Sequence, residues 1–156
     1  MRNYHYDYIL LKIKDFIEQE IKASIYKNGI KLIDKYIKEG KRIVLISATI
    51  EELVMPIGEI LGFQKNDILA INTKKENGKI TGDILGTLSF KEGKVIRFLE
   101  WMEFNDTKFK KEDITFYSDS INDLPLLEYV GKPIATNPCQ KLLDIAKKNN
   151  WTIVRL

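Results

Sequence analysis

Residues 116–127, Phe-Tyr-Ser-Asp-Ser-Ile-Asn-Asp-Leu-Pro-Leu-Leu, decide the fold, because they place two carboxylates four residues apart directly after a predicted strand. That strand is residues 113–117, which carry the β-branched and aromatic side chains of a buried strand. Asn and Pro residues supply the turn that stops it. Ligands of open α/β sheets bind just beyond the carboxyl ends of strands, so Asp119 stands where a ligand is expected. Carboxylate oxygens suit Mg²⁺, and we predict a Mg²⁺ site at Asp119 and Asp123.

The rest of the chain alternates helical and extended patterns. Apolar residues recur at helical spacing in two segments before Gly40. Residues 42–46 form a short apolar run typical of a buried parallel strand, with Ser47 at its carboxyl end. Residues 49–52 have the form of a capping box, opening a helix that ends at Gly62. The elements expected after it are a strand and a hairpin within residues 67–86 that turns at Asn77-Gly78, a helix that begins near Lys94, a helix over residues 141–149 and a closing strand over residues 151–154. The alternation predicts an α/β fold with a parallel sheet.

Composition indicates an ordinary globular protein of 156 residues, 44% hydrophobic and 30% charged. Its 25 basic and 22 acidic residues are dispersed, which predicts no nucleic-acid partner. We also predict no membrane partner, because no apolar run approaches spanning length. The single cysteine, Cys139, cannot form an internal disulfide, and one histidine, His5, cannot build a zinc cluster. These counts indicate a cytoplasmic protein, in which Cys139 is expected to be structural or incidental.

Three stretches of the chain, taken together, resemble the haloacid dehalogenase (HAD) superfamily of phosphatases, and most closely the branch that contains phosphoserine phosphatase. The family's second motif, a Ser or Thr at a strand end, is matched by Ser47. The third, a Lys near a helix start, is matched by Lys94. The fourth is the acidic loop, with Asp119 and Asp123 in the metal-site positions and Asn122 beside them. The resemblance runs from roughly residue 40 to the C-terminus.

The resemblance implies a role for each matched residue. Ser47 and Lys94 are the expected catalytic residues, and both bind the phosphoryl group, Ser47 by donating a hydrogen bond and Lys94 by neutralising charge. Ala48, at the start of the following helix, adds a backbone donor to the phosphate site. Mg²⁺ is held partly by Asp119, while Asp123 orients Asp119 or the metal-bound water. Asn122 shapes the loop.

Each of these residues also has a plainer interpretation. Ser47 by itself reads as a turn or capping residue, and Lys94 as one of many solvated surface charges. The two aspartates could form turns, since Asp commonly bonds nearby backbone groups.

The family's first motif, Asp-x-Asp-x-Thr/Val, is absent, since no two Asp residues are spaced i, i+2. The resemblance implies that the first Asp of that motif is the nucleophile and the second is the general acid/base. We therefore predict that the chain is inactive alone. The nearest imitation, Glu18-x-Glu20, lies in an amphipathic helix and is interpreted as a solvated face.

The missing motif has a structural consequence, because in this family its strand lies in the centre of the sheet. The predicted fold is a Rossmann-like, HAD-type parallel sheet with flanking helices and a small β-hairpin excursion, lacking its central first strand and most of its helical cap. Residues 8–11 are apolar enough to replace the strand, but their spacing favours helix. We interpret residues 1–40 as a remnant of the cap with a leading helix, and residues 41–156 as the HAD-like core of one domain. The chain is expected to be the C-terminal portion of a longer phosphatase.

Two functions follow as hypotheses. The first is a Mg²⁺-dependent phosphomonoester hydrolase that acts on a small phosphorylated metabolite, with phosphoserine a candidate by resemblance only. The second is a non-catalytic phosphate-binding or interaction protein, or one half of a split enzyme, in which a homo-oligomer or a partner chain completes the sheet.

Overall fold

The computed structural model describes residues 4–105 and 107–156. It divides into two compact units, Met1–Leu88 and Ser89–Leu156. Each unit contains a three-stranded sheet and its own buried apolar cluster. This division differs from the predicted boundary near residue 40. The assignment of residues 1–40 to a cap remnant and of residues 41–156 to the core stays a prediction.

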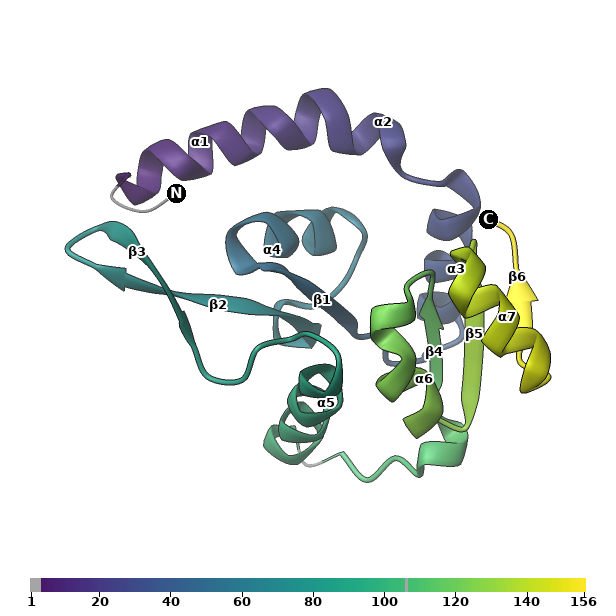
Figure 1. Ribbon diagram of the computed structural model, residues 1–156. Coiled ribbons are helices and arrows are strands. Elements are labelled where there is room, and N and C mark those ends of the chain that lie inside the picture. The colour runs from purple at the N-terminus through teal and green to yellow at the C-terminus, as the bar shows by residue number, and fades with distance from the viewer. Residues whose placement is uncertain (1–3, 106) are drawn as a thin grey trace. The chain divides into compact units, whose positions relative to one another are not determined.

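The first unit begins with helices and continues through a strand, a helix and a hairpin (Figure 1). Its elements in order are α1 (Tyr6–Phe16), the π-turn η1 (Ile17–Ile21), α2 (Lys22–Ser24), α3 (Lys27–Lys38), β1 (Leu45–Ile50), α4 (Glu51–Ile60), the 3₁₀ turn η2 (Lys65–Asp67), β2 (Ile68–Glu76) and β3 (Lys79–Leu85). β1 pairs with β2 in parallel, and β2 pairs with β3 in antiparallel orientation.

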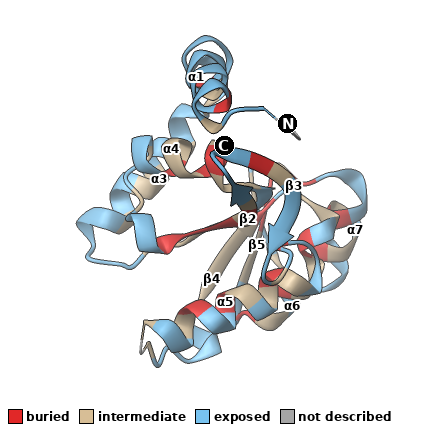
Figure 2. Ribbon diagram, turned by 90° about the vertical axis from the view of Figure 1, so that its left-hand side faces the viewer, coloured by how far each residue is buried: buried red, intermediate tan, exposed pale blue. Residues whose placement is uncertain are grey.

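The first helical segment confirms the helix predicted for residues 8–11. Ile9 and Ile17 are its buried residues, while much of α1 is exposed (Figure 2). The start of α1 is fixed to the hairpin, because the backbone N–H of Tyr6 donates a 2.8 Å hydrogen bond to the carbonyl of Gly78. An isolated bridge between His5 and Lys79 extends this contact.

Strand β1 differs from the predicted strand over residues 42–46. It runs over Leu45–Ile50, so Ser47 lies within the strand, and α4 begins at Glu51 without a side-chain cap. The predicted capping box at residues 49–52 is therefore wrong. The register explains the shift, because Leu45 pairs with Ile68 and Ile50 with Ile71, around an irregularity between them.

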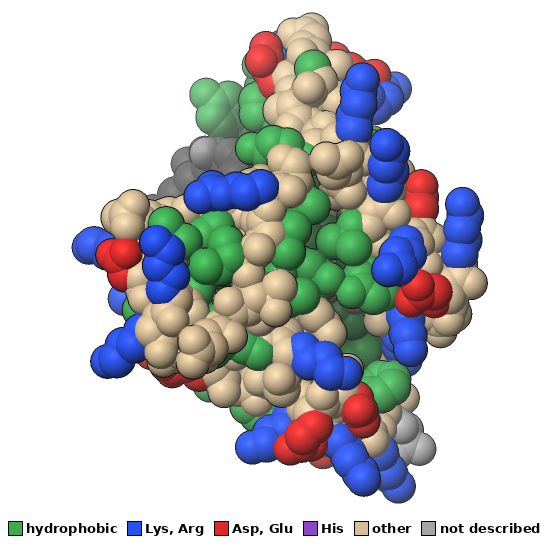
Figure 3. Space-filling view, turned by 90° about the vertical axis from the view of Figure 1, so that its right-hand side faces the viewer, with side chains coloured by type: hydrophobic (Ala, Val, Ile, Leu, Met, Phe, Trp, Pro, Cys, Tyr) green, Lys and Arg blue, Asp and Glu red, His purple; other side chains and the backbone are tan. Residues whose placement is uncertain are grey.

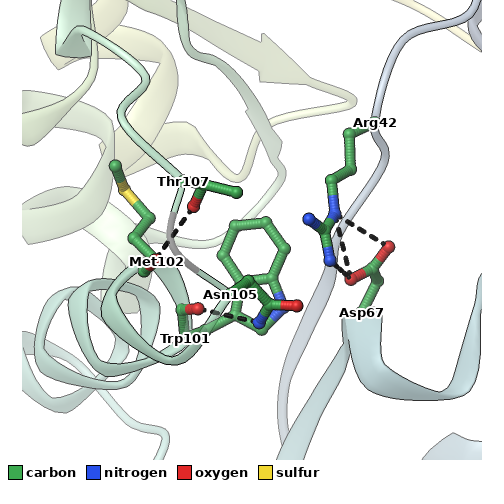
Figure 4. A network of polar contacts seen from close by, with 6 residues as sticks. All are labelled: Arg42, Asp67, Trp101, Met102, Asn105 and Thr107. Atoms are coloured by element: carbon green, nitrogen blue, oxygen red, sulfur yellow. Dashed lines mark hydrogen bonds and ion pairs between the residues drawn. The ribbon is translucent and has the colours of Figure 1, made fainter.

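Two features hold the rest of the first unit. The predicted hairpin is confirmed, since Asn77 and Gly78 both have positive φ, of 50° and 71°, as a tight turn between β2 and β3 requires. Arg42, ahead of β1, donates a bidentate pair of hydrogen bonds to Asp67 at the end of η2, with a shortest distance of 2.7 Å (Figure 4). This ion pair links the segment that precedes β1 to the turn that precedes β2.

The second unit is a parallel sheet with helices. Its elements are α5 (Glu92–Phe104), the 3₁₀ turn η3 (Lys111–Asp113), β4 (Thr115–Ser118), the 3₁₀ turn η4 (Ile121–Asp123), α6 (Leu124–Tyr129), β5 (Lys132–Thr136), α7 (Gln140–Lys148) and β6 (Thr152–Val154). β5 lies between β4 and β6 and is parallel to both. The predicted α/β fold with parallel strands is confirmed.

Helix and sheet share one core in this unit. Leu127, Ala135, Leu142 and Ala146 are fully buried, and Trp151 packs against them. The amphipathic spacing of α7 explains why Leu142 and Ala146 reach this core while its lysines stay exposed.

Helix α5 ends where its last carbonyls receive polar donors. The side-chain amide of Asn105 donates to the Trp101 carbonyl at 2.8 Å, and the Thr107 hydroxyl donates to the Met102 carbonyl at 3.1 Å (Figure 4). Both carbonyls also accept backbone N–H groups, from Asn105 and Thr107 respectively, at 3.0 Å, so the side-chain bonds reinforce the last turn of the helix.

The surface carries both positive and negative side chains, as the dispersed basic and acidic residues of the sequence indicate. Figure 3 shows lysine and arginine side chains scattered over the face that it draws, with acidic side chains among them. Among residues 4–105 and 107–156, no helix has the length and apolar character needed to cross a membrane.

Candidate functional site

The acidic loop begins where β4 ends, as predicted. β4 stops at Ser118, and after Asp119 and Ser120 the turn η4 begins directly at Ile121. Serine side chains fold the loop: Ser118 Oγ accepts from the backbone N–H of Ser120 at 3.1 Å, and Ser120 Oγ accepts from that of Asn122 at 3.2 Å. Short local bonds of this kind hold the loop against the strand end.

Lys94 and Asp123 form a buried ion pair in the second unit. Lys94 Nζ lies 2.6 Å from Asp123 Oδ1, and the two side chains are only 7% and 11% exposed. Ser118 Oγ donates a 2.7 Å hydrogen bond to the other carboxylate oxygen, Oδ2. Asp123 is therefore engaged by two protein groups, and Lys94 is a buried, positioned cation rather than a solvated surface charge.

Asp119 differs from Asp123 in its exposure and in its ion pairing. Its side chain is exposed, and within the described residues its carboxylate forms no ion pair. The backbone carbonyl of Asp119 accepts a 3.0 Å hydrogen bond from the N–H of Cys139, which connects the loop to the start of α7. The Asp119 carboxylate is thus held on a fixed backbone and remains open to a ligand.

The donor set tests the predicted Mg²⁺ site. Among the described residues, no three His, Cys, Asp or Glu side chains cluster closely enough to hold a metal ion. One open carboxylate nevertheless fits Mg²⁺, which keeps several waters and commonly takes one or two protein carboxylates. The residues present fit a metal held through Asp119, with Asp123 already committed to Lys94.

Ser47 and Ala48 belong to the first unit and lie in the middle of β1, not at its carboxyl end as predicted. Ser47 is partly buried, and its Oγ accepts a 3.2 Å hydrogen bond from the backbone N–H of Thr49, while Ala48 is exposed. The hydroxyl hydrogen of Ser47 stays available to an acceptor. The structure thus brings Lys94 and Asp123 together in one unit and leaves Ser47 and Ala48 together in the other.

A second polar cluster was not predicted as a site. It joins the first turn of α4 to β2, where Lys75 Nζ lies 2.8 Å from Glu51 Oε1 and 3.2 Å from Glu52 Oε1. Thr73 donates a short hydrogen bond from its hydroxyl to Glu52 Oε1. The Tyr6 ring completes the cluster, with its centroid 4.8 Å from Lys75 Nζ. Two consecutive acids after a strand were visible in the sequence, but their partners lie more than twenty residues away.

The cluster keeps Lys75 charged. Burial lowers the pKa of Lys75, but hydrogen bonds and charge attraction from Glu51 and Glu52 outweigh burial and raise it well above its ordinary value of 10.5. Glu52 has a fully buried side chain, and its Oε2 has no hydrogen-bond partner among the described residues. An ionised oxygen left in this state carries a desolvation penalty.

Two further hydroxyls are buried without a partner in the described part of the chain, Ser89 Oγ and Thr136 Oγ1. Thr136 ends β5, next to β4 in the sheet. Neither Thr136 nor Ser118 was predicted as a site residue, although Ser118 directly precedes Asp119.

Comparison with known proteins gives a consistent family. The family described as "HAD: haloacid dehalogenase-like hydrolase" matches residues 2–128. A histidinol-phosphatase of Neisseria meningitidis is 33% identical over 145 residues, which are 90% of this chain and 64% of that protein. The phosphoserine phosphatase SerB1 of Mycobacterium tuberculosis is 30% identical over 142 residues, 90% of this chain and 44% of that protein. The chain thus spans between 44% and 64% of the length of these two relatives.

Solved structures agree with this result. A protein of unknown function from Bordetella pertussis superposes with a TM-score of 0.90 at 31% identity, over 97% of this chain and 67% of that one. A phospho-aspartyl intermediate analogue of phosphoserine phosphatase superposes with a TM-score of 0.60 at 22% identity, over 81% of this chain and 56% of that one. The second similarity concerns the fold alone.

Proposed function

Because the chain belongs to the haloacid dehalogenase-like hydrolase family, we propose that it binds small phosphorylated metabolites as part of Mg²⁺-dependent phosphomonoester hydrolysis. The observation that carries the proposal is the acidic loop after β4, where an open carboxylate on Asp119 accompanies a buried Lys94–Asp123 pair. A carboxylate that can hold a metal ion and a fixed lysine ammonium both support phosphoryl transfer, because positioning and electrostatic stabilisation dominate its catalysis.

We propose that Ser47, Ala48 and Lys94 each bind phosphate, as the resemblance of their segments to the family implies. Ser47 donates its hydroxyl hydrogen to a phosphoryl oxygen, and the backbone N–H of Ala48 adds a second donor. An ammonium carries three N–H donors, and Asp123 uses one of those on Lys94, so two remain for a phosphoryl oxygen. Lys94 thereby neutralises charge on the substrate while Asp123 fixes its position.

Asp119 is the residue proposed to hold Mg²⁺, which would supply charge neutralisation at this loop when bound. We assign Asp123 an orienting role, because its two oxygens already bind Lys94 and Ser118. Asn122 is exposed at the turn and shapes the loop through its backbone N–H.

The alternative is a phosphate-binding or interaction protein without turnover. It is favoured by one observation, the absence of any two Asp residues spaced i, i+2, which leaves no counterpart of the nucleophile that the resemblance implies. A partner strand or a second copy is part of the same proposal, because within the described residues β1 pairs only with β2 and β4 only with β5.

The test combines binding and turnover. Binding of inorganic phosphate is followed by ³¹P NMR and hydrolysis of p-nitrophenyl phosphate by absorbance, both with and without Mg²⁺. We expect phosphate binding that weakens in Ser47→Ala, and no turnover by the chain alone. Glu128→Gln, an exposed change on α6, is the matched control for Asp119→Asn. Mg²⁺-dependent turnover that Asp119→Asn abolishes would establish the hydrolase and overturn the predicted inactivity. Absence of both binding and turnover would overturn the phosphate proposal.

A further inference from the structure

The tip of the hairpin between β2 and β3 consists of Asn77 and Gly78. Glu76 pairs directly with Lys79, so the loop contains only these two residues. The backbone φ is 50° at Asn77 and 71° at Gly78, and a type I′ turn requires a positive φ at both central residues. Both residues are exposed, and a Cβ built on Gly78 would meet no atom within 4 Å. Solvent therefore reaches the backbone of the tip.

The dipeptide Asn77-Gly78 carries an electrophile next to a nucleophile. The backbone nitrogen of Gly78 can attack Cγ of the Asn77 side chain and close a five-membered succinimide ring. Ring closure requires a ψ of about −120° at the asparagine, which is the ψ of the first central residue in a type II′ turn. Types I′ and II′ share a positive φ at that residue, and both close two-residue hairpins. A flip of the peptide plane between Asn77 and Gly78, which glycine tolerates, therefore reaches the reactive geometry while β2 and β3 stay paired.

A second Asn-Gly pair, Asn28-Gly29, lies in the first turn of α3. Asn28 is exposed as well, and Gly29 is partly buried. The N–H of Ile30 donates a 3.1 Å hydrogen bond to the carbonyl of Tyr26 and closes the helical turn around Asn28. A helix holds ψ at about −42°, so rotation to the reactive ψ would break this bond. The fold thus permits the reaction at the asparagine of the hairpin and restrains it at the asparagine of the helix.

We propose that Asn77 is a site of spontaneous modification, at which asparagine is converted to aspartate and isoaspartate through a succinimide, and that the isoaspartate form releases the start of α1. As the nitrogen of Gly78 bonds to Cγ of Asn77, the bond from Cγ to the side-chain nitrogen breaks, and ammonia leaves with the proton that Gly78 loses. Water then opens the ring. Cleavage of the bond to Cγ gives aspartate, whereas cleavage of the bond to the main-chain carbonyl carbon gives isoaspartate. Water is the co-reactant, and the site gains a negative charge.

The release of α1 follows from the position of the modified residue. The N–H of Tyr6 donates its 2.8 Å hydrogen bond to the carbonyl of Gly78, and the bridge between His5 and Lys79 lies next to it in the chain. Isoaspartate passes the main chain through its Cβ, which adds a methylene group ahead of Gly78. A two-residue turn does not accommodate the extra atom, because loop length and turn type set the register of the two strands. The carbonyl of Gly78 therefore moves away from Tyr6, whereas aspartate leaves the main chain unchanged and keeps the bond.

The test compares the two Asn-Gly pairs in the same molecule. The full chain is incubated in mildly alkaline buffer, and samples are digested and analysed by mass spectrometry, with isoaspartate detected by an isoaspartate methyltransferase. We expect Asn77 to be converted about tenfold faster than Asn28, which corresponds to a difference in barrier of about 1.4 kcal/mol. In the chain unfolded by urea, the two rates should become similar. A native ratio near or below one overturns the inference, as does a ratio that persists in urea or an absence of conversion at Asn77.

Amide hydrogen exchange at Tyr6 measures the release of α1. The isoaspartate form, separated by ion-exchange chromatography, should exchange the Tyr6 amide faster than the unmodified chain. Asn77→Asp controls for the added charge and should exchange as wild type does. Asn77→Gly keeps a residue that tolerates positive φ and removes the electrophile, so its Tyr6 exchange should not change during the incubation. Equal exchange in the isoaspartate form and the unmodified chain overturns the release of α1, and this comparison decides alone if either variant does not fold by circular dichroism.

Discussion

Replacement of Lys94 by Met tests whether its ion pair with Asp123 organises the second unit. The change keeps most of the apolar stem and removes the ammonium, which leaves the Asp123 carboxylate, 11% exposed, with the Ser118 hydroxyl as its remaining bonded partner among the described contacts. At 2.6 Å and an effective dielectric constant of about 20, the attraction is about 6 kcal/mol before desolvation. Removing one partner of such a pair costs about 3–5 kcal/mol of unfolding free energy.

Urea denaturation followed by tryptophan fluorescence is the assay, because both tryptophans of the chain, Trp101 and Trp151, lie in the second unit and Trp101 is buried. Asp123→Asn and the double variant complete a mutant cycle, for which we expect a coupling energy of about 2 kcal/mol. Lys147→Met, an exposed lysine change on α7, should stay within about 0.5 kcal/mol of wild type. A folded Lys94→Met chain that loses less than about 1 kcal/mol, with costs that add in the double variant, would refute the reasoning.

Three further predictions concern other parts of the molecule. Gly131→Ala should lower the unfolding free energy by about 2 kcal/mol, because its Cβ would meet the backbone Cα of Glu112 at 2.4 Å. In Gly40→Ala the new Cβ meets no atom, but the backbone φ of 68° is strained for alanine, so this variant should lose about 1 kcal/mol. Urea midpoints that rank the two variants the other way would contradict this. The raised pKa of Lys75 adds stability that is fully present below pH 10.5 and is lost as pH rises through the folded-state pKa. The urea midpoint should therefore fall less between pH 10 and 12 in Lys75→Met than in wild type. An equal fall in both proteins would argue against a stabilising contact of Lys75 with Glu51 and Glu52. Millimolar Mg²⁺ should raise the melting temperature of the wild-type chain and not that of Asp119→Asn, while an equal shift in both would remove Asp119 from the metal site.

The predictions that succeeded rest on local signals. Asn77-Gly78 specifies its turn through two residues that tolerate positive φ. Asp119 follows a strand whose composition marks it, and Lys94 sits in the first turn of α5 as predicted. Such signals are contained in a few neighbouring residues, so the sequence exposes them directly.

The misses come from interactions between distant residues. β1 continues through Ser47 because β2 pairs with it as far as Ile71, which composition around Ser47 does not reveal. Strand β5 was not predicted. It contains Pro133, a residue that normally argues against a central strand, yet β5 pairs with β4 on one side and with β6 on the other. The partner of Asp123 is a lysine on another helix, and the Glu52 cluster depends on residues of β2. Pairings of this kind are set by the fold and are not visible in local pattern.

The bond from Tyr6 to Gly78 has a consequence for biosynthesis. α1 leaves the ribosome well before the hairpin turn that anchors it, and about 70 residues must be added at about 5–20 residues per second before Gly78 exists. For several seconds the N-terminal end of α1 therefore lacks its hydrogen-bond partner at the hairpin turn. The hairpin, whose contacts are local, closes within microseconds once it has emerged. The contact between the start of α1 and the hairpin can therefore form only after the turn at Gly78 has been synthesised.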